Sequence, residues 1–200
     1  MTTVAVATSE VPREVPHGLA AARVAATNAI AERFFVEQAD AIAITCRGMA
    51  DRFQRGARLL VSGDDAQRSD MAHVVVEFLH PVVVGKRALP AIPLPDIQSG
   101  AAAHALATLG MSGDIFMLLC AADVHARAHE LLTRARARGM LTIALTGVTA
   151  SNTSGSAIPA NHVFTVPSAD WCIVQETQEM LYHVLWELVH VFFDHRTVHT

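Results

Sequence analysis

The chain has 200 residues, of which 52% are hydrophobic and 17% are charged. This length and composition favour one globular α/β domain with a sizeable core and exclude a disordered chain, because the apolar surface can offset the entropy of ordering. Fifteen Lys and Arg against nineteen Asp and Glu give a net charge of −4. Such a balance offers no broad attraction for nucleic acid or anionic lipid, so we expect neither as a partner.

The cysteines and the N-terminus indicate the compartment. Cys46, Cys120 and Cys172 are widely spaced and form no CxxC pair, which is typical of a reducing environment. The first residues lack a basic segment followed by a long apolar core, and the chain has no apolar run long enough to span a bilayer. We expect a soluble, cytoplasmic protein.

In chain order, residues 1–16 contain two prolines and no sustained period, which predicts a flexible arm. Residues 17–197 are interpreted as a single domain. Its first part, up to about residue 53, has apolar residues at helical spacing and predicts one long helix or two successive helices.

The remainder alternates short apolar runs with helical patterns. Strands are predicted at residues 58–62, 90–94, 115–120, 141–146 and 163–166. Helices are predicted at about 69–80, 100–109, 124–138 and 174–193. This alternation predicts an α/β three-layer sandwich with a parallel sheet, in which ligands bind beyond the carboxyl ends of the strands.

Two helical segments carry candidate metal ligands. His73 and Glu77 are four residues apart, so both side chains project from one helix face and can share a metal ion. On spacing alone a solvated face is the commoner explanation. Gln175 and His183 are eight residues apart, about 12 Å along a helix, so they share an ion only if their side chains converge or come from different protomers.

Two further pairs of residues have competing interpretations. Asp64 and Asp65 follow the first predicted strand and form either a paired carboxylate site or, as we favour, a turn. Cys120 and Cys172 are reactive only if exposed near positive charge, and buried inert thiols are commoner.

Four blocks of sequence carry a family resemblance. They are LLVSGDDAQRSDMAHVVVEFL, LPAIPLPDI, GMSGDIFMLLCAADVH with RGMLTIALTG, and VPSADWCIVQETQEMLYHVLWELV. In order and spacing they resemble the phosphoheptose isomerases of the sugar isomerase (SIS) superfamily over about residues 20–195. The resemblance implies a flavodoxin-like fold with a five-stranded parallel sheet, N-terminal helices, and a homotetramer with active sites at subunit contacts.

The resemblance also implies a zinc site. His73, Glu77, Gln175 and His183 fall on the four positions that hold zinc in the isomerases. By the same analogy Glu77 and His183 are the catalytic acid/base pair, which moves a proton between adjacent sugar carbons through an enediol while the metal polarises the oxygens.

The chain departs from the family in both loops that hold the substrate phosphate. The first loop reads Gly63, Asp64, Asp65, Ala66, Gln67, where the family has small neutral residues. The second, from Cys120 to His125, contains no serine or threonine. Two carboxylates would repel a phosphate dianion. In the same predicted ligand pocket, Asp96 matches a family aspartate, whereas Cys172 replaces another.

Three functions follow from this pattern. The leading hypothesis is a zinc-binding, tetrameric SIS-domain protein whose ligand is not an ordinary sugar phosphate. The second is a non-catalytic, metal-dependent accessory or regulatory protein that binds a protein partner. The third is a genuine sedoheptulose 7-phosphate isomerase with an unusual phosphate site.

Overall fold

The computed structural model describes residues 17–81, 85–122, 124–148 and 157–197. The arm predicted for residues 1–16 lies outside the described residues. The elements, in chain order, are α1 (His17–Gln54), β1 (Leu59–Gly63), the 3-10 helix η1 (Asp65–Gln67), α2 (Arg68–Leu79), β2 (Ala91–Pro93), α3 (Ala101–Leu109), β3 (Ile115–Leu119), α4 (Ala126–Ala137), β4 (Leu141–Thr146), β5 (His162–Thr165) and α5 (Trp171–Thr197).

The five strands form one parallel sheet in the order β2-β1-β3-β4-β5. Every residue of β1, β3 and β4 is buried, as expected for central strands covered on both faces. The register pairs Gly63 at the end of β1 with Leu119 at the end of β3. The loops that follow these two strands therefore begin level with each other.

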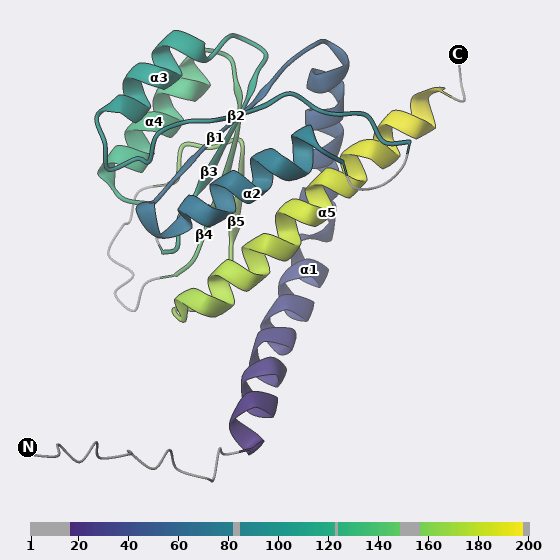
Figure 1. Ribbon diagram of the computed structural model, residues 1–200, viewed down its shortest axis with the longest axis vertical. Coiled ribbons are helices and arrows are strands. Elements are labelled where there is room, and N and C mark those ends of the chain that lie inside the picture. The colour runs from purple at the N-terminus through teal and green to yellow at the C-terminus, as the bar shows by residue number, and fades with distance from the viewer. Residues whose placement is uncertain (1–16, 82–84, 123, 149–156, 198–200) are drawn as a thin grey trace, which may run out of the picture.

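Helices cover both faces of the sheet (Figure 1). On one face α3 and α4 pack over a core that includes Leu106, Phe116 and Leu132. On the other face α1, α2 and α5 enclose a second core, in which Phe53, Phe78 and other large side chains are fully buried. The predicted three-layer α/β sandwich is confirmed.

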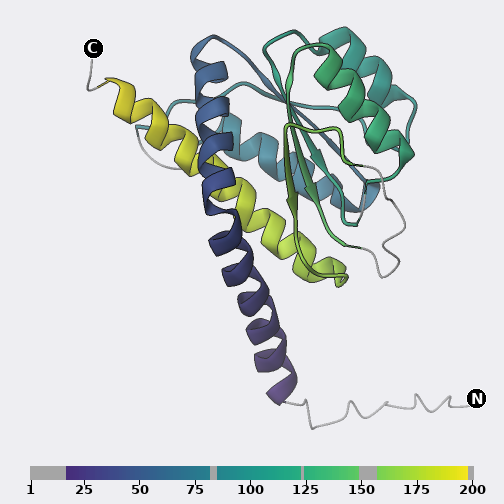
Figure 2. The same ribbon diagram turned by 180° about the vertical axis from the view of Figure 1, so that it is seen from behind.

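Helix α1 is one continuous helix of 38 residues and not two. Its C-terminal half lies against the body of the molecule, whereas its N-terminal half projects beyond the sheet, as the two opposite views show (Figures 1 and 2). None of the helices within the described residues combines the length and apolar character needed to cross a bilayer.

The predicted strands and helices match the observed ones to within a few residues. The largest differences are at α5, which begins at Trp171 and ends at Thr197 instead of spanning about 174–193. The turn favoured at Asp64 and Asp65 is the short helix η1, with Asp64 at its N-cap position.

The close approach of β1 and β3 at Gly63 generates a test of this architecture. A methyl group added at Gly63 would lie 2.6 Å from the Leu119 carbonyl oxygen, whereas one added at Gly100 would have no neighbour within 4 Å. We expect Gly63→Ala to lower the free energy of unfolding by about 1–3 kcal/mol because neighbouring backbone must shift. Urea unfolding monitored by circular dichroism measures it, with Gly100→Ala as the matched control. Equal midpoints for the two variants would contradict this packing.

Candidate metal centre

Helices α2 and α5 bring together three of the four predicted ligands, His73, Glu77 and His183. The His73 Nε2 atom lies 3.4 Å from Glu77 Oε1 and 3.4 Å from His183 Nε2. The third side of this triangle, from His183 Nε2 to Glu77 Oε1, measures 4.0 Å. Residues 110 positions apart in the sequence thus present two ring nitrogens and one carboxylate oxygen to a common point.

Glu179 on α5 adds a carboxylate that the sequence analysis did not identify. Its Oε1 lies 3.5 Å from His73 Nδ1, and ligand atoms of His73, Glu179 and His183 all lie within 4.8 Å of one another. The signal was present in the sequence, because Glu179 precedes His183 by four residues and so shares its helix face. We call His73, Glu77, Glu179 and His183 the His/Glu cluster.

Gln175, predicted as a ligand, makes a different contact. Its amide Nε2 donates a hydrogen bond of 2.7 Å to the carboxylate of Asp70 on α2. Asp70 is only 4% exposed, and its other oxygen lies 3.4 Å from the hydroxyl of the fully buried Tyr182. Gln175 therefore helps to satisfy a buried charge next to the cluster.

Tyr182 links this buried carboxylate to the cluster. Its hydroxyl lies 2.8 Å from His73 Nδ1. Burial, followed by the nearby charge of Asp70, raises the pKa of Tyr182 above its ordinary value. Tyr182 therefore stays a neutral phenol at physiological pH, with one proton to donate and an oxygen that can accept.

The geometry of the cluster fits zinc. Ligand atoms about 2.0–2.2 Å from a tetrahedral zinc ion are about 3.3–3.6 Å apart, and two sides of the triangle have this length. Imidazole nitrogens with carboxylate oxygens are ligands that zinc accepts readily. The residues present can therefore hold this metal.

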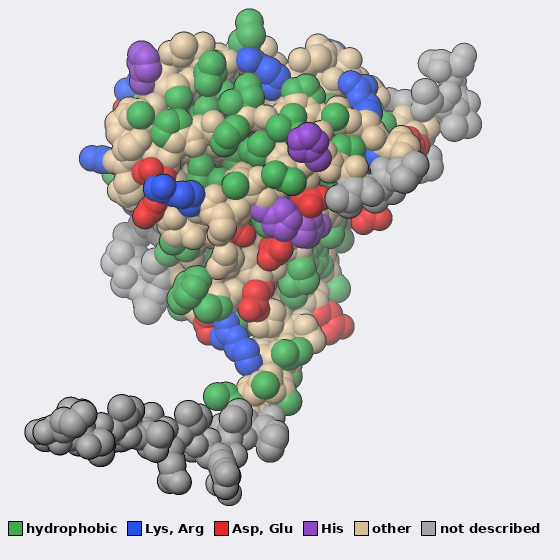
Figure 3. All heavy atoms as spheres, in the orientation of Figure 1, with side chains coloured by type: hydrophobic (Ala, Val, Ile, Leu, Met, Phe, Trp, Pro, Cys, Tyr) green, Lys and Arg blue, Asp and Glu red, His purple; other side chains and the backbone are tan. Residues whose placement is uncertain are grey.

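A groove between α1 and α5 leads to the cluster. It encloses about 460 Å³, and His183 and Glu179 line it together with Arg23, Val24, Thr27, Asn28, Glu176 and Met180. Two polar contacts join the helices along it, an ion pair of Arg23 with Asp170 and a hydrogen bond from Thr27 to Glu176. Figure 3 shows histidine and acidic side chains gathered on the surface over α2 and α5.

The other predicted pocket residues lie mostly at the carboxyl ends of β1, β2 and β3. Asp64 and His125 are in contact, with 3.1 Å between Oδ1 and Nε2. Asp65 is exposed and pairs with Arg68. Asp96 accepts hydrogen bonds of 3.0 Å from the backbone of Gln98 and Ser99.

Gln67, Cys120 and Cys172 have structural contacts. The buried Gln67 amide donates to Gln178, which in turn donates to the carbonyl of Cys120 and so ties both loops to α5. The Cys120 side chain is fully buried. Cys172 lies in the first turn of α5, where its backbone N–H donates to Asp170.

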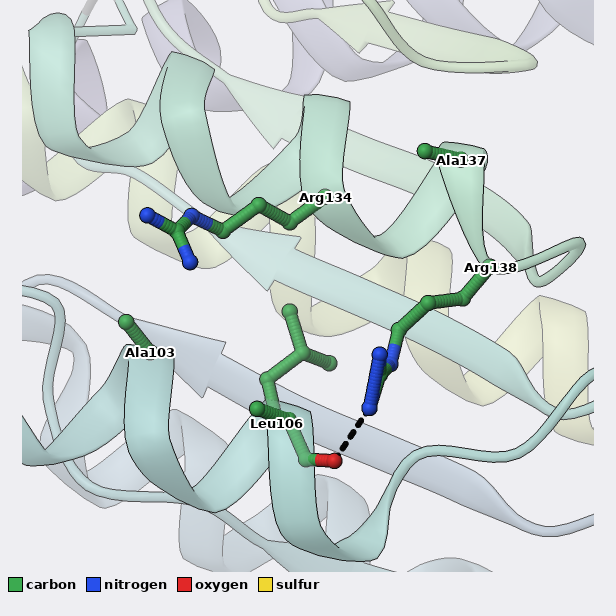
Figure 4. Close-up of a pocket in the computed structure, with 6 residues that line it drawn as sticks. Ala103, Leu106, Arg134, Ala137 and Arg138 are labelled. Atoms are coloured by element: carbon green, nitrogen blue, oxygen red, sulfur yellow. Dashed lines mark hydrogen bonds between the residues drawn. The ribbon is translucent and has the colours of Figure 1, made fainter.

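A separate cavity of about 350 Å³ lies between α3 and α4, on the opposite face of the sheet (Figure 4). Its lining consists of four apolar residues with Arg134 and Arg138. Both arginines already have partners, because Arg134 pairs with Glu130 and Arg138 donates to the carbonyl of Ala107. This cavity brings together none of the predicted site residues.

Comparison with known proteins identifies relatives in sequence and in structure. No family model matches the chain. It is 24% identical over 179 residues to a phosphoheptose isomerase of Maridesulfovibrio salexigens, covering 82% of this chain and 85% of that one. It is 27% identical over 172 residues to one of Thermodesulfovibrio yellowstonii, covering 80% and 84%.

Among solved structures, a phosphoheptose isomerase from Francisella tularensis superposes with a TM-score of 0.70 at 19% identity, covering 88% of this chain and 98% of that one. The enzyme from Neisseria gonorrhoeae gives 0.69 at 17%, covering 86% and 97%.

The parallel sheet, its strand order and these structural neighbours show that the chain shares its α/β fold with the phosphoheptose isomerases. In sequence, the chain is similar to phosphoheptose isomerases at 24% and 27% identity over most of its length.

Proposed function

We propose that this protein is a zinc-dependent, isomerase-like enzyme whose ligand is a sugar other than an ordinary sugar phosphate. The observation that carries the proposal is the triangle of His73 Nε2, His183 Nε2 and Glu77 Oε1, of which His183 also lines the groove between α1 and α5. Glu179 is the best placed further ligand. The resemblance implied Gln175 as a ligand. In this structure its side-chain amide donates a hydrogen bond to Asp70, which lies beside the cluster.

Tyr182 and Asp70 are proposed as positioning residues for His73. A carboxylate can only accept, so the single proton of Tyr182 is best used toward Asp70. The Tyr182 oxygen then accepts from His73 Nδ1–H. This tautomer leaves a lone pair on Nε2, the atom that faces Glu77 and His183, and such support is the usual arrangement behind a metal-binding histidine.

The chemistry follows from the donor set. A bound zinc ion supplies Lewis acidity that polarises a carbonyl and its neighbouring hydroxyl. The Glu77 carboxylate takes a proton from the carbon beside the carbonyl and returns it to the adjacent carbon. His183 lines the groove, and with its Nε2 held by the metal its Nδ1 would be the atom that exchanges a proton with the sugar oxygen. The carboxylate of Asp64, which binds the hydrogen-bond donors of the second loop, is the reason for proposing a ligand without a phosphate group.

The homotetramer that the resemblance implies motivates a proposal on quaternary structure. We infer a homotetramer whose contacts include α1, because Leu19, Val24, Val36 and Ile44 on this helix are more than half exposed. Apolar side chains spread over a projecting helix are typical of an interface between copies. The groove beside α1 would then lie near a subunit contact.

The reduced cysteines favour the cytoplasm as the compartment.

Metal binding is the first prediction from this proposal. We expect one zinc ion per protomer, and a loss of affinity of more than about a hundredfold in His73→Ala and His183→Ala. Tyr182→Phe, which removes the hydroxyl that contacts both His73 and the buried Asp70, should lose about 10-fold to 100-fold. Competition with a chromogenic chelator measures these affinities. His104→Ala, an exposed position on α3, is the control and should bind as the wild type does. Wild-type protein that takes up no zinc would contradict the proposal.

Catalysis is the second prediction. With zinc bound, the protein should interconvert the aldose and ketose forms of a neutral sugar such as sedoheptulose, and Glu77→Gln should reduce the rate by about 10²-fold to 10⁴-fold. Product analysis by chromatography measures it, with His104→Ala as the active control. Turnover of sedoheptulose 7-phosphate alone would instead identify an ordinary isomerase. Zinc binding without turnover of a panel of free and phosphorylated sugars would favour the non-catalytic accessory protein.

The third prediction concerns assembly. Light scattering at micromolar concentration should give about four times the chain mass of 21.5 kDa. Replacing Val36 and Ile44 by Glu should reduce that mass, because charge on an interface helix is poorly tolerated. A monodisperse wild-type monomer would contradict a tetramer.

A further inference from the structure

The carboxyl ends of β1 and β3 form the point in this sheet where the strand order reverses. Ligands of open parallel sheets bind in the crevice at such a point, because the two connecting loops diverge there. In this chain the loops that begin at Asp64 and Cys120 flank that crevice. It is occupied by a side chain of the protein itself.

That side chain is Asp64. Its Oδ2 accepts a hydrogen bond of 3.3 Å from the backbone N–H of Ala121, and its Oδ1 lies 3.1 Å from His125 Nε2. An aspartate at an N-cap position ordinarily binds an N–H group of its own helix, but Asp64 makes no such bond to η1. Its carboxylate instead reaches across to the second loop.

His125 has two contacts besides Asp64. Its Nδ1 accepts a hydrogen bond of 3.5 Å from the backbone N–H of Ala128 at the start of α4, and its Nε2 also lies 3.1 Å from the side-chain amide of Gln98. Because Nδ1 accepts, we assign the ring proton to Nε2, which donates it to Asp64. The positive end of the α4 dipole adds to the attraction for a negative group here. One backbone donor and one side-chain donor, both suited to an anion, are thus already bound to a carboxylate.

The neighbouring charges give an external anion no advantage. Arg68 is paired with Asp65 and lies 3.6 Å from a carboxylate oxygen of Asp96. Among the described residues, Asp64, Asp65 and Asp96 place three carboxylates at this edge, and the nearby Arg127 already donates to the carbonyl of Gln98. A dianionic group entering here would meet like charge and would find these donors occupied.

We propose that Asp64 is a built-in anion that closes an anion-binding site, so that the crevice takes a neutral or cationic polyhydroxy ligand. This selectivity rests on the proposed function only in naming that ligand a sugar. Asp65 has no such role, since its side chain is 68% exposed and its partner is Arg68. The two adjacent aspartates, alike in the sequence, therefore differ in what they do.

The test removes the Asp64 carboxylate and measures how tightly the protein then binds a simple anion, inorganic phosphate. Asp64→Ser removes the carboxylate, frees the donors of Ala121 and His125, and leaves a hydroxyl as a further donor. We expect the affinity for inorganic phosphate, measured by calorimetric titration at pH 8, to rise at least about tenfold over wild type. Asp65→Ser removes the same charge one residue away and should leave the affinity within about twofold of wild type.

Two further variants make the result specific. Adding His125→Ala to Asp64→Ser should abolish most of the gain, because it removes a freed donor. Asp64→Asn keeps the size of the side chain and removes its charge, and it should raise phosphate affinity by a smaller factor, which covers the case of a serine variant that fails to fold. Equal phosphate affinity in wild type and Asp64→Asn, or an equal gain in the Asp64 and Asp65 serine variants, would overturn the proposal.

The titration separates this inference from the proposed function. It requires neither zinc nor turnover, so it can succeed in a protein that binds no metal. Conversely, a zinc-dependent isomerase whose Asp64 variants gain no phosphate affinity would overturn the role of Asp64 alone.

Discussion

The packing of α2 against α5 is the contact on which the candidate metal centre depends. It buries the carboxylate of Asp70, and burial of a charge is costly unless hydrogen bonds compensate. Gln175 and Tyr182, both from α5, provide partners for that carboxylate. The same contact fixes the rotation of α5, and thereby sets His183 3.4 Å from His73. The packing of α2 against α5 thus supplies hydrogen bonds to the buried Asp70 and also places His183 beside His73.

The His/Glu cluster and the crevice between β1 and β3 differ in character. At the His/Glu cluster, nitrogen and oxygen atoms converge with room between them for an ion. At the crevice between β1 and β3, hydrogen-bond donors are instead satisfied internally by Asp64. Gln178 on α5 connects the two loops to each other through Gln67 and the carbonyl of Cys120.

Much of the fold could be predicted from the sequence because its signals are local. Three strands are buried along their whole length and therefore read as continuous apolar runs, and His73 and Glu77 share a face by helical spacing alone. The partners across the structure could not be predicted in this way. Gln175 donates to Asp70, 105 residues away, and Asp64 meets His125 at a separation of 61 residues. Such contacts depend on how elements pack, which periodicity does not encode.

X-ray absorption spectroscopy of the zinc-loaded protein tests the central claim, a zinc centre built from the His/Glu cluster, most directly. The account predicts two imidazole nitrogens at about 2.0–2.1 Å, with oxygen atoms completing the shell. Those nitrogens belong to His73 and His183, and the oxygens to carboxylates or water. A shell containing sulfur at about 2.3 Å, or fewer than two imidazoles, would contradict the account, because the metal would then be bound elsewhere in the chain.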